Sequence, residues 1–341
     1  MDQVGIKQVA AAAKVSRGTV DRVLHGRSGV NSRTRQRVLE IVRSLGYRPN
    51  FAARTLRRNL CLKIAAINFP AHSPLFFDSL RNGISAAVNP LSGTIKVQFY
   101  GREFCDSPKT AFDQTPSCGL SGVILAPGAG RVNRQVFDEA VRRGIPIVCV
   151  ASDMPENPRL SAVMARPYVC GALAAEVIGL ARSRPGAVAA VTGWLTNFNH
   201  SEKVRGFRTK LSDAPGLRVE TVLETLDEPA LVYDQTAKLL ANCSDLRAIY
   251  VTTSHSLPVI EALRMAGRLA ETYVVTTDLF NELKPLIRDR VVLATIHQKP
   301  FEQGQLAFRV LYEYLSEGVQ PATVINVNPA LILSSNMEGA G

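Results

Sequence analysis

Strand-like and helix-like segments alternate along the chain after Lys63, and this alternation restricts the fold more than any other feature of the sequence. Short apolar runs such as KIAAINF, IPIVCVAS and YVVTTD are separated by stretches with helical spacing of apolar residues. A chain with this pattern forms parallel sheets covered by helices. The segment spans about 280 residues, which is more than one such unit usually holds. We therefore expect two α/β lobes with a cleft between them.

Ligands of open parallel sheets bind beyond the carboxyl ends of the strands. The candidates for effector binding are polar residues that follow predicted strands and two aromatic residues at a predicted helix start: Asp153, Asp278, Gln298, Phe76 and Phe77. Two alternatives stay open. Asp278 could instead cap a helix that begins near Asn281, and the two phenylalanines could belong to the core.

The composition changes before Lys63. Residues 1–63 carry 14 Lys or Arg against 3 Asp or Glu, whereas the remaining residues carry 26 of each, so the first segment holds the whole net charge of +11. Such a basic segment indicates a phosphate-rich partner, either nucleic acid or an anionic membrane surface. No apolar run reaches the ~18 residues of a membrane span, and we expect no membrane association.

The pattern within this basic segment favours DNA. Apolar spacing predicts three short helices in about 46 residues, with Ser16 capping the second helix and Asn31 capping the third. A helix, a tight turn and a capped second helix make a helix-turn-helix, whose second helix reads base edges in the major groove. The reading residues would be Arg17, Gly18 and Thr19. The alternative is a plain three-helix bundle with a solvated basic face.

A family resemblance is carried by two segments. The run IKQVAAAAKVSRGTVDRVLHGRSGVNSRTRQRVLEIVRSLGYRPNFAARTL resembles the DNA-binding and hinge region of the LacI/GalR family of bacterial transcription regulators. The run TTDLFNELKPLIRDRVVLATIHQKPFEQGQLAFRVLYEYL resembles the family's sugar-binding region, which is similar to ribose-type periplasmic binding proteins. The resemblance implies a helix-turn-helix domain at 1–47, a hinge helix and linker at 48–62, and a two-lobed α/β periplasmic-binding-protein-like domain for effector binding and dimerisation at 63–341.

The resemblance also implies how DNA is bound. Two subunits of a homodimer, with a tetramer as the larger alternative, would sit on double-stranded operator DNA, and each would insert Leu56 of a hinge helix into the minor groove. In the other interpretation Leu56 only packs on the third helix. The further DNA contacts implied by the resemblance are Arg22, Asn31, Thr34, Arg35, Asn50, Ala53 and Arg54.

Two departures from the family pattern bear on the effector. Arg166 stands where the family commonly has Asp, and Ser201 stands where ribose-type proteins have an arginine ahead of the GF pair, with Lys203 nearby. A buried guanidinium needs a carboxylate or phosphate partner, so we expect an anionic effector such as a sugar phosphate or sugar acid. The alternative is that Arg166 pairs with Asp153 or Asp278, which would leave a neutral pocket for an ordinary sugar.

Enzymatic and cofactor signals are weak. The sequence has no HExxH, GxSxG or P-loop motif, and we expect no metal and no cofactor. The N-terminus does not match a secretory signal, and six cysteines without a CxxC pair fit a reducing cytoplasm. The prediction is a cytoplasmic, sugar-responsive transcriptional regulator, with repression as the expected mode. The rival hypotheses are a sugar-binding protein or a sugar-modifying enzyme without a regulatory role.

Overall fold

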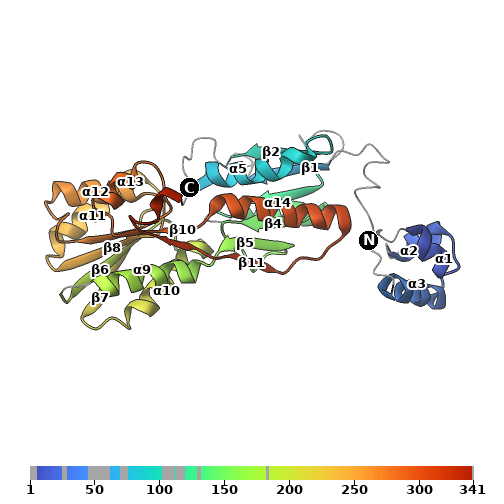
Figure 1. Ribbon diagram of the computed structural model, residues 1–341, viewed down its shortest axis with the longest axis horizontal. Helices are drawn as coiled ribbons and strands as arrows, with labels where there is room; N and C mark the ends of the chain where they lie inside the picture. The colour runs from blue at the N-terminus through green and yellow to red at the C-terminus, as the bar shows by residue number, and fades with distance from the viewer. Residues whose placement is uncertain are drawn as a thin grey trace.

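The computed structural model describes residues 6–24, 29–44, 62–69, 76–101, 112, 120–128, 132–181 and 184–339. It confirms the predicted fold class, with a three-helix head followed by two α/β lobes (Figure 1). The predicted hinge helix lies outside the described residues. In the described part of the chain, no helix is long and apolar enough to cross a membrane. The predicted domain limits stay a prediction.

The head consists of α1 (Ile6–Ala12), α2 (Arg17–Leu24) and α3 (Ser32–Ser44). Apolar side chains from all three helices form its core: Val9, Ala10, Ala13, Val20, Val23 and Val38. The side-chain oxygen of Ser16 accepts a hydrogen bond from the backbone N–H of Thr19 (3.1 Å), and that of Asn31 accepts from the N–H of Thr34 (2.8 Å). Both predicted helix caps are confirmed.

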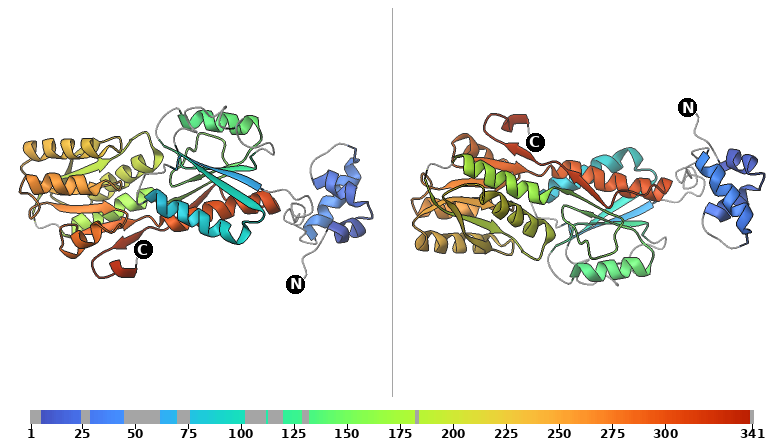
Figure 2. Two further views of the ribbon diagram at one scale, coloured as in Figure 1. Left: turned by 90° about the horizontal axis from the view of Figure 1, so that it is seen from above. Right: turned by 90° about the horizontal axis from the view of Figure 1, so that it is seen from below.

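The first lobe is a six-stranded parallel sheet. Its strands, in spatial order, are β11 (Val324–Val327), β5 (Ser161–Ala165), β4 (Ile147–Val150), β3 (Gly122–Leu125), β1 (Leu62–Ile67) and β2 (Ile95–Tyr100). One face packs on α5 (Phe76–Val88), which continues into the 3₁₀ turn η1 (Asn89–Leu91), and on α14 (Pro300–Glu317); the other packs on α8 (Val132–Arg142). Figure 2 shows these helices on opposite sides of the sheet.

The second lobe repeats this plan. Its strands, in spatial order, are β12 (Ala330–Ile332), β10 (Ala294–His297), β9 (Tyr273–Thr277), β8 (Leu246–Val251), β6 (Gly186–Thr192) and β7 (Leu217–Glu224), with β12 antiparallel to β10. One face packs on α9 (Pro167–Ala181) and α10 (Phe198–Leu211). The other packs on α11 (Pro229–Asn242), α12 (Ser256–Met265), α13 (Leu283–Arg288) and the 3₁₀ turn η2 (Met337–Gly339).

The chain passes between the lobes where β5 leads into α9, where β10 leads into α14, and where β11 leads into β12. The run TVINVNPALIL near the end of the chain spans the last of these three passages. The structure divides that segment into β11 and β12, which lie in different sheets. Each lobe therefore contains strands and helices from both halves of the sequence, and relative motion of the lobes bends these connections.

Each lobe has one helix pair in very close contact. A Cβ added to Gly83 of α5 would lie 2.0 Å from the carbonyl oxygen of Phe301, and one added to Gly304 of α14 would lie 2.2 Å from that of Leu80. In the second lobe, a Cβ on Gly171 of α9 would lie 1.8 Å from the carbonyl oxygen of Lys203, a residue of α10. Only glycine allows the helix backbones to approach this closely.

Candidate effector cleft and DNA-reading helix

The start of α2 presents the residues predicted to read DNA. Arg17, Gly18 and Arg22 are exposed. Thr19 is half-buried, and its hydroxyl lies 3.0 Å from the Ser16 hydroxyl, so it also takes part in the cap. These positions agree with a reading helix, and contact with DNA stays a prediction.

The predicted backbone contacts are divided between described and undescribed parts of the chain. Asn31, Thr34 and Arg35 lie together at the start of α3, where the positive end of the helix dipole favours an anion. The other residues predicted to contact DNA lie outside the described residues: Asn50, Ala53, Arg54 and Leu56.

A cavity of about 1280 Å³ lies between the two lobes and is lined by residues from both. Its walls are formed where strands end. Asn68 and Phe69 follow β1, Ser152 follows β4, Thr252 follows β8, and Asp278 follows β9. This is the position expected for a ligand of open parallel sheets. Asn68, Ala151 and Asp278 have left-handed φ values of 65°, 67° and 65°. Strained backbone at non-glycine residues is common at binding sites.

The first lobe contributes an aromatic wall. Phe69, Phe76, Phe77 and Phe99 all line the cavity, and Phe69 contacts Phe77 and Phe99 edge to face, with ring centroids 6.1 and 5.6 Å apart. Phe76 and Phe77 are half-buried and also pack against the core. The two interpretations offered by the sequence therefore both apply, because the same rings support the core and face the cavity.

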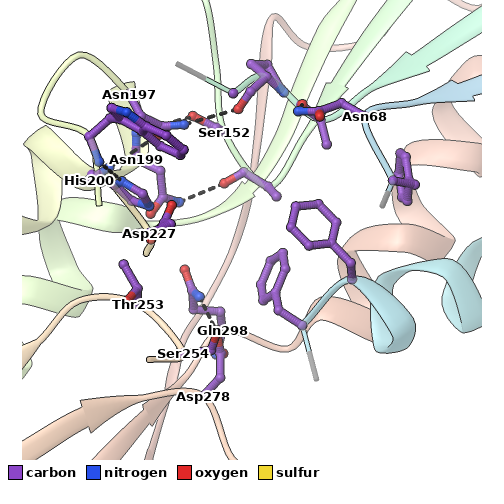
Figure 3. A pocket seen from close by; sticks show the side chains of 18 of the residues that line it. Asn68, Ser152, Asn197, Asn199, His200, Asp227, Thr253, Ser254, Asp278 and Gln298 are labelled. Atoms are coloured by element: carbon purple, nitrogen blue, oxygen red, sulfur yellow. Dashed lines mark hydrogen bonds between the residues drawn. The ribbon is translucent and has the colours of Figure 1, made fainter. Parts of the chain in front are cut away.

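Asp278 and Gln298 form a buried pair in the second lobe (Figure 3). The Asp278 carboxylate accepts hydrogen bonds from the Gln298 backbone N–H (3.0 Å) and from the side-chain Nε2 (2.7 Å). Asp278 does not cap a helix, since α13 begins after Glu282. The pair fixes the Gln298 amide at the cavity, where its oxygen can accept from a ligand hydroxyl.

A second polar cluster on the same side contains Lys203, His200 and Asp227. The Lys203 Nζ is buried and donates to the carbonyl oxygen of Thr252 (2.9 Å). The imidazole Nδ1 of His200 accepts from the backbone N–H of Trp194 (3.0 Å), and burial lowers the His200 pKa to about 3. Burial raises the pKa of Asp227, although interactions with His255 and Lys203 lower it in part. All six residues named in this paragraph line the cavity.

Two asparagines at the start of α10 join the lobes directly (Figure 3). Asn197 donates to the carbonyl oxygen of Pro127 (3.1 Å) and accepts from the Ser152 hydroxyl (3.0 Å). Asn199 donates to the carbonyl oxygen of Ala151 (2.7 Å). Asn197, Asn199 and Ser152 are buried, so one side of the cleft is closed by hydrogen bonds between the two lobes.

Three predicted effector contacts lie away from the cavity lining. Asp153 is buried in an ion pair with Arg159, not with Arg166. Arg166 is exposed where β5 leads into α9, and the Ser201 hydroxyl donates to the carbonyl oxygen of Phe198 within α10. The expectation that Arg166 is buried beside the cleft was wrong, because the chain leaves the first lobe at this point and the side chain faces solvent.

The rule that ligands bind beyond strand ends indicates the segments that hold most of these cavity residues, but it does not identify the individual side chains. The cavity is also lined by residues that were not predicted from the sequence: Asn68, Arg81, Trp194, Asn197, Asn199, His200, Asp227, Thr252, Thr253, Ser254 and His255. Asn68, Thr252 and Thr253 directly follow apolar runs, so the strand-end rule could have named them. Arg81 and Asp227 lie in a helix and a turn, and no local signal marks them.

Comparison with known proteins decides the family. A model of the periplasmic binding protein domain matches residues 64–318, and a model of the bacterial regulatory proteins of the lacI family matches residues 5–50. The chain belongs to the lacI family. As a lacI-family regulator it combines a DNA-binding head with an effector domain of the periplasmic-binding-protein type.

Relatives of this lacI-family chain match it almost from end to end. Catabolite control protein A of Priestia megaterium is 27% identical over 95% of this chain and 96% of its own length. The HTH-type transcriptional repressor PurR of Mannheimia succiniciproducens is 23% identical over 98% of each chain. Both relatives are named for regulation.

Solved structures share the fold of the two lobes. The glucose-galactose binding protein GanP from Geobacillus stearothermophilus superposes with a TM-score of 0.74 at 20% identity, covering 81% of this chain and 99% of that one. A solute binding protein from Burkholderia graminis, in complex with D-arabinose, superposes with a TM-score of 0.74 at 22% identity, covering 82% and 98%. At these identities the likeness shows the fold alone.

Proposed function

We propose that this lacI-family regulator is a cytoplasmic, homodimeric repressor whose operator affinity is set by a small polyhydroxylated effector, a sugar or sugar derivative, bound between the lobes. The observation that carries the proposal is the cavity itself. Strand-end polar groups of both lobes and an aromatic wall converge on one space, in a chain that also carries a capped, exposed reading helix. The named functions of the relatives support the regulatory half of the proposal.

The lining suits a sugar on chemical grounds. Sugars present hydroxyls that donate and accept, and they have an apolar ring face that packs on aromatic rings. The Asp278–Gln298 pair supplies acceptors, Lys203 supplies a donor, and the phenylalanine wall supplies the apolar surface. Two solved structures of the same fold, one named a glucose-galactose binding protein and one in complex with D-arabinose, also support a sugar.

The charge of the cavity does not require an anionic effector. Among the described lining residues, the basic side chains other than histidine are Arg81 and Lys203, and the acidic side chains are Asp227 and Asp278. The Arg81 guanidinium donates to Asp78 and to the carbonyl oxygen of Phe69. A neutral polyol or sugar therefore fits the balance of charge, and the argument for an anion from Arg166 no longer holds.

Coupling between effector and operator would work through the relative position of the lobes. An effector that contacts both walls stabilises one lobe arrangement, and the head is joined to the first lobe just before β1. Two sites that bias one two-state element affect each other's affinity equally. Operator affinity measured with and without the effector gives the sign of this coupling, release or promotion of operator binding.

Operator selection and a ligand panel test the proposal together. We expect the full chain to select a palindromic sequence from random duplexes, and neutral sugars to raise its melting temperature and to change operator affinity. A fragment that begins at Lys63 should bind the same sugar and no DNA, and Leu56→Ala should weaken operator binding while leaving sugar binding intact. Sugar turnover by the purified protein, or sugar binding without any operator selection, would favour the rival functions.

A further inference from the structure

Lys203 places a buried amine at the cavity. The residue is 2% exposed and lines the cavity, and its Nζ donates to the carbonyl oxygen of Thr252. None of the ion pairs in the described ranges includes Lys203. An ammonium group has three donors and would need more acceptors than this one carbonyl.

Burial favours the neutral form of this amine. Desolvation lowers the pKa of Lys203 below its ordinary value, although interactions with Cys170, Asp278 and Asp227 raise it in part. The Cys170 thiol stays protonated, since burial raises its pKa to about 12. His200 in the same cluster is neutral at neutral pH, because burial lowers its pKa to about 3. A neutral lysine carries a lone pair and is a nucleophile.

The backbone of Lys203 is held in a fixed position. Its carbonyl oxygen lies where a Cβ of Gly171 would be, at 1.8 Å, so α9 and α10 have no room to shift against each other. The amine is therefore presented to the cavity from a rigid helix pair, which favours attack on a bound group in one orientation.

A proton donor lies in the same cluster. Asp227 lines the cavity, and burial raises its pKa. Its carboxyl group therefore keeps its proton up to a higher pH than an exposed aspartate does. Both carboxyl oxygens lie close to Gly193, where an added Cβ would be 2.5 and 2.6 Å from them, so the carboxyl group occupies space that a side chain would fill. Amine and acid together form the pair that imine chemistry requires.

We propose that Lys203 captures the carbonyl carbon of a small hydroxylated aldehyde as a reversible imine, so that the cleft senses carbonyl compounds. The lone pair of Nζ attacks the carbonyl carbon, the C–N bond forms, and a proton passes from nitrogen to the former carbonyl oxygen. The resulting hydroxyl leaves as water with a proton from Asp227, and the nitrogen proton returns to the Asp227 carboxylate as the C=N bond forms. The sum is amine plus aldehyde giving imine plus water, without oxidation or reduction. This inference rests on the proposed effector role of the cleft and names its chemical class.

Reductive trapping tests the proposal directly. The full chain is incubated at neutral pH with D-glyceraldehyde and cyanoborohydride, and the modified lysines are mapped by peptide mass spectrometry. We expect Lys203 to be labelled about ten times faster than the exposed Lys238, because an exposed lysine is almost wholly protonated at this pH. Lys203→Arg removes the nucleophile and should abolish labelling at this position, and its melting temperature shows whether it folds.

Matched ligands and a second variant separate the possible outcomes. Glycerol has hydroxyls but no carbonyl group, and it should protect the protein less than glyceraldehyde; glycerate tests a purely ionic role of Lys203. Asp227→Asn should slow labelling of Lys203 without a matching loss of melting temperature. Labelling of Lys203 no faster than Lys238, or glycerate stabilising the protein while no adduct forms, would overturn the proposal. The proposed function would not be affected by that result, because operator selection and the ligand panel test it separately.

Discussion

Each lobe packs a pair of helices against its sheet at glycine contacts, α5 with α14 in the first lobe and α9 with α10 in the second. The surfaces that the lobes turn toward the cleft differ. The first lobe offers phenyl rings, whereas the second offers the Asp278–Gln298 pair and the cluster around Lys203. The same packing plan thus carries two kinds of chemistry, because the side chains that face the cleft differ between the lobes while the helix contacts are alike. The following predictions test this division between shared packing and separate chemistry.

The largest effect should come from the shared packing. Gly304→Ala in the first lobe and Gly171→Ala in the second each place a methyl group on a backbone carbonyl oxygen, at 2.2 and 1.8 Å. We expect each to lower the free energy of unfolding by about 1–3 kcal/mol, the usual cost of overpacking. Chemical denaturation measures this cost. Gly93→Ala is the matched control, because nothing lies within 4 Å of a Cβ at that position. A loss in the control equal to that in the two variants would refute the packing argument.

The next effect separates the two walls of the cleft. Asp278→Asn keeps the size of the side chain and suits the left-handed backbone, but it removes the charge that holds Gln298. With the sugar that gives the largest shift in the ligand panel, affinity should fall about 10- to 100-fold, as for loss of a hydrogen bond to a charged group.

Phe77→Leu is the corresponding change in the first lobe. It keeps an apolar wall and removes one ring, so affinity should fall about 3- to 10-fold. Calorimetry on both variants compares the walls. A larger loss for Phe77→Leu than for Asp278→Asn would show that the aromatic wall dominates recognition.

A feature could be predicted from the sequence when the residues that form it are close together along the chain. The lobes, the caps at Ser16 and Asn31 and the strand-end position of Asp278 follow from local patterns, so they could be predicted. The hydrogen bond from Asn199 to Ala151 joins residues 48 positions apart in different lobes, and it depends on how the lobes meet. Arg166 was expected to be buried, but its local sequence does not show that the chain leaves the first lobe there and that the side chain faces solvent.

Acid should destabilise the second lobe before the first. Burial lowers the His200 pKa to about 3 in the folded protein, against about 6.5 when unfolded. The unfolded state then binds the extra proton, so stability is lost as pH falls below about 6.5, by up to ~1.4 kcal/mol per pH unit. In the first lobe, Glu139 pairs with Arg142 and Arg143, which hold its pKa at about 2. Its contribution is lost only as pH falls below the ordinary glutamate value.

The only tryptophan, Trp194, lies in the second lobe and reports this difference. Tryptophan fluorescence should give a lower denaturation midpoint at pH 5 than at pH 7, and His200→Gln should reduce that pH dependence. Hydrogen exchange followed by mass spectrometry reports the first lobe in the same samples. Equal acid sensitivity in both lobes would contradict the assignment to His200.

The smallest effect should come from the contacts between the lobes. Asn199→Ala removes a donor to the carbonyl oxygen of Ala151 and leaves that oxygen without this partner, at a cost of about 1 kcal/mol for one hydrogen bond. Because the same bond holds the lobes together, its loss should also widen the cleft, with an increase in the radius of gyration measured by small-angle X-ray scattering. Ser201→Ala is the matched control on the same helix, since that hydroxyl bonds within α10 and not across the cleft. If the control opened the lobes as much as Asn199→Ala, the bond between the lobes would not be what holds them. If only Asn199→Ala opened the lobes, hydrogen bonds between the lobes would be needed to keep the cleft closed. The two walls, which differ in chemistry, would then be brought together by a few polar contacts.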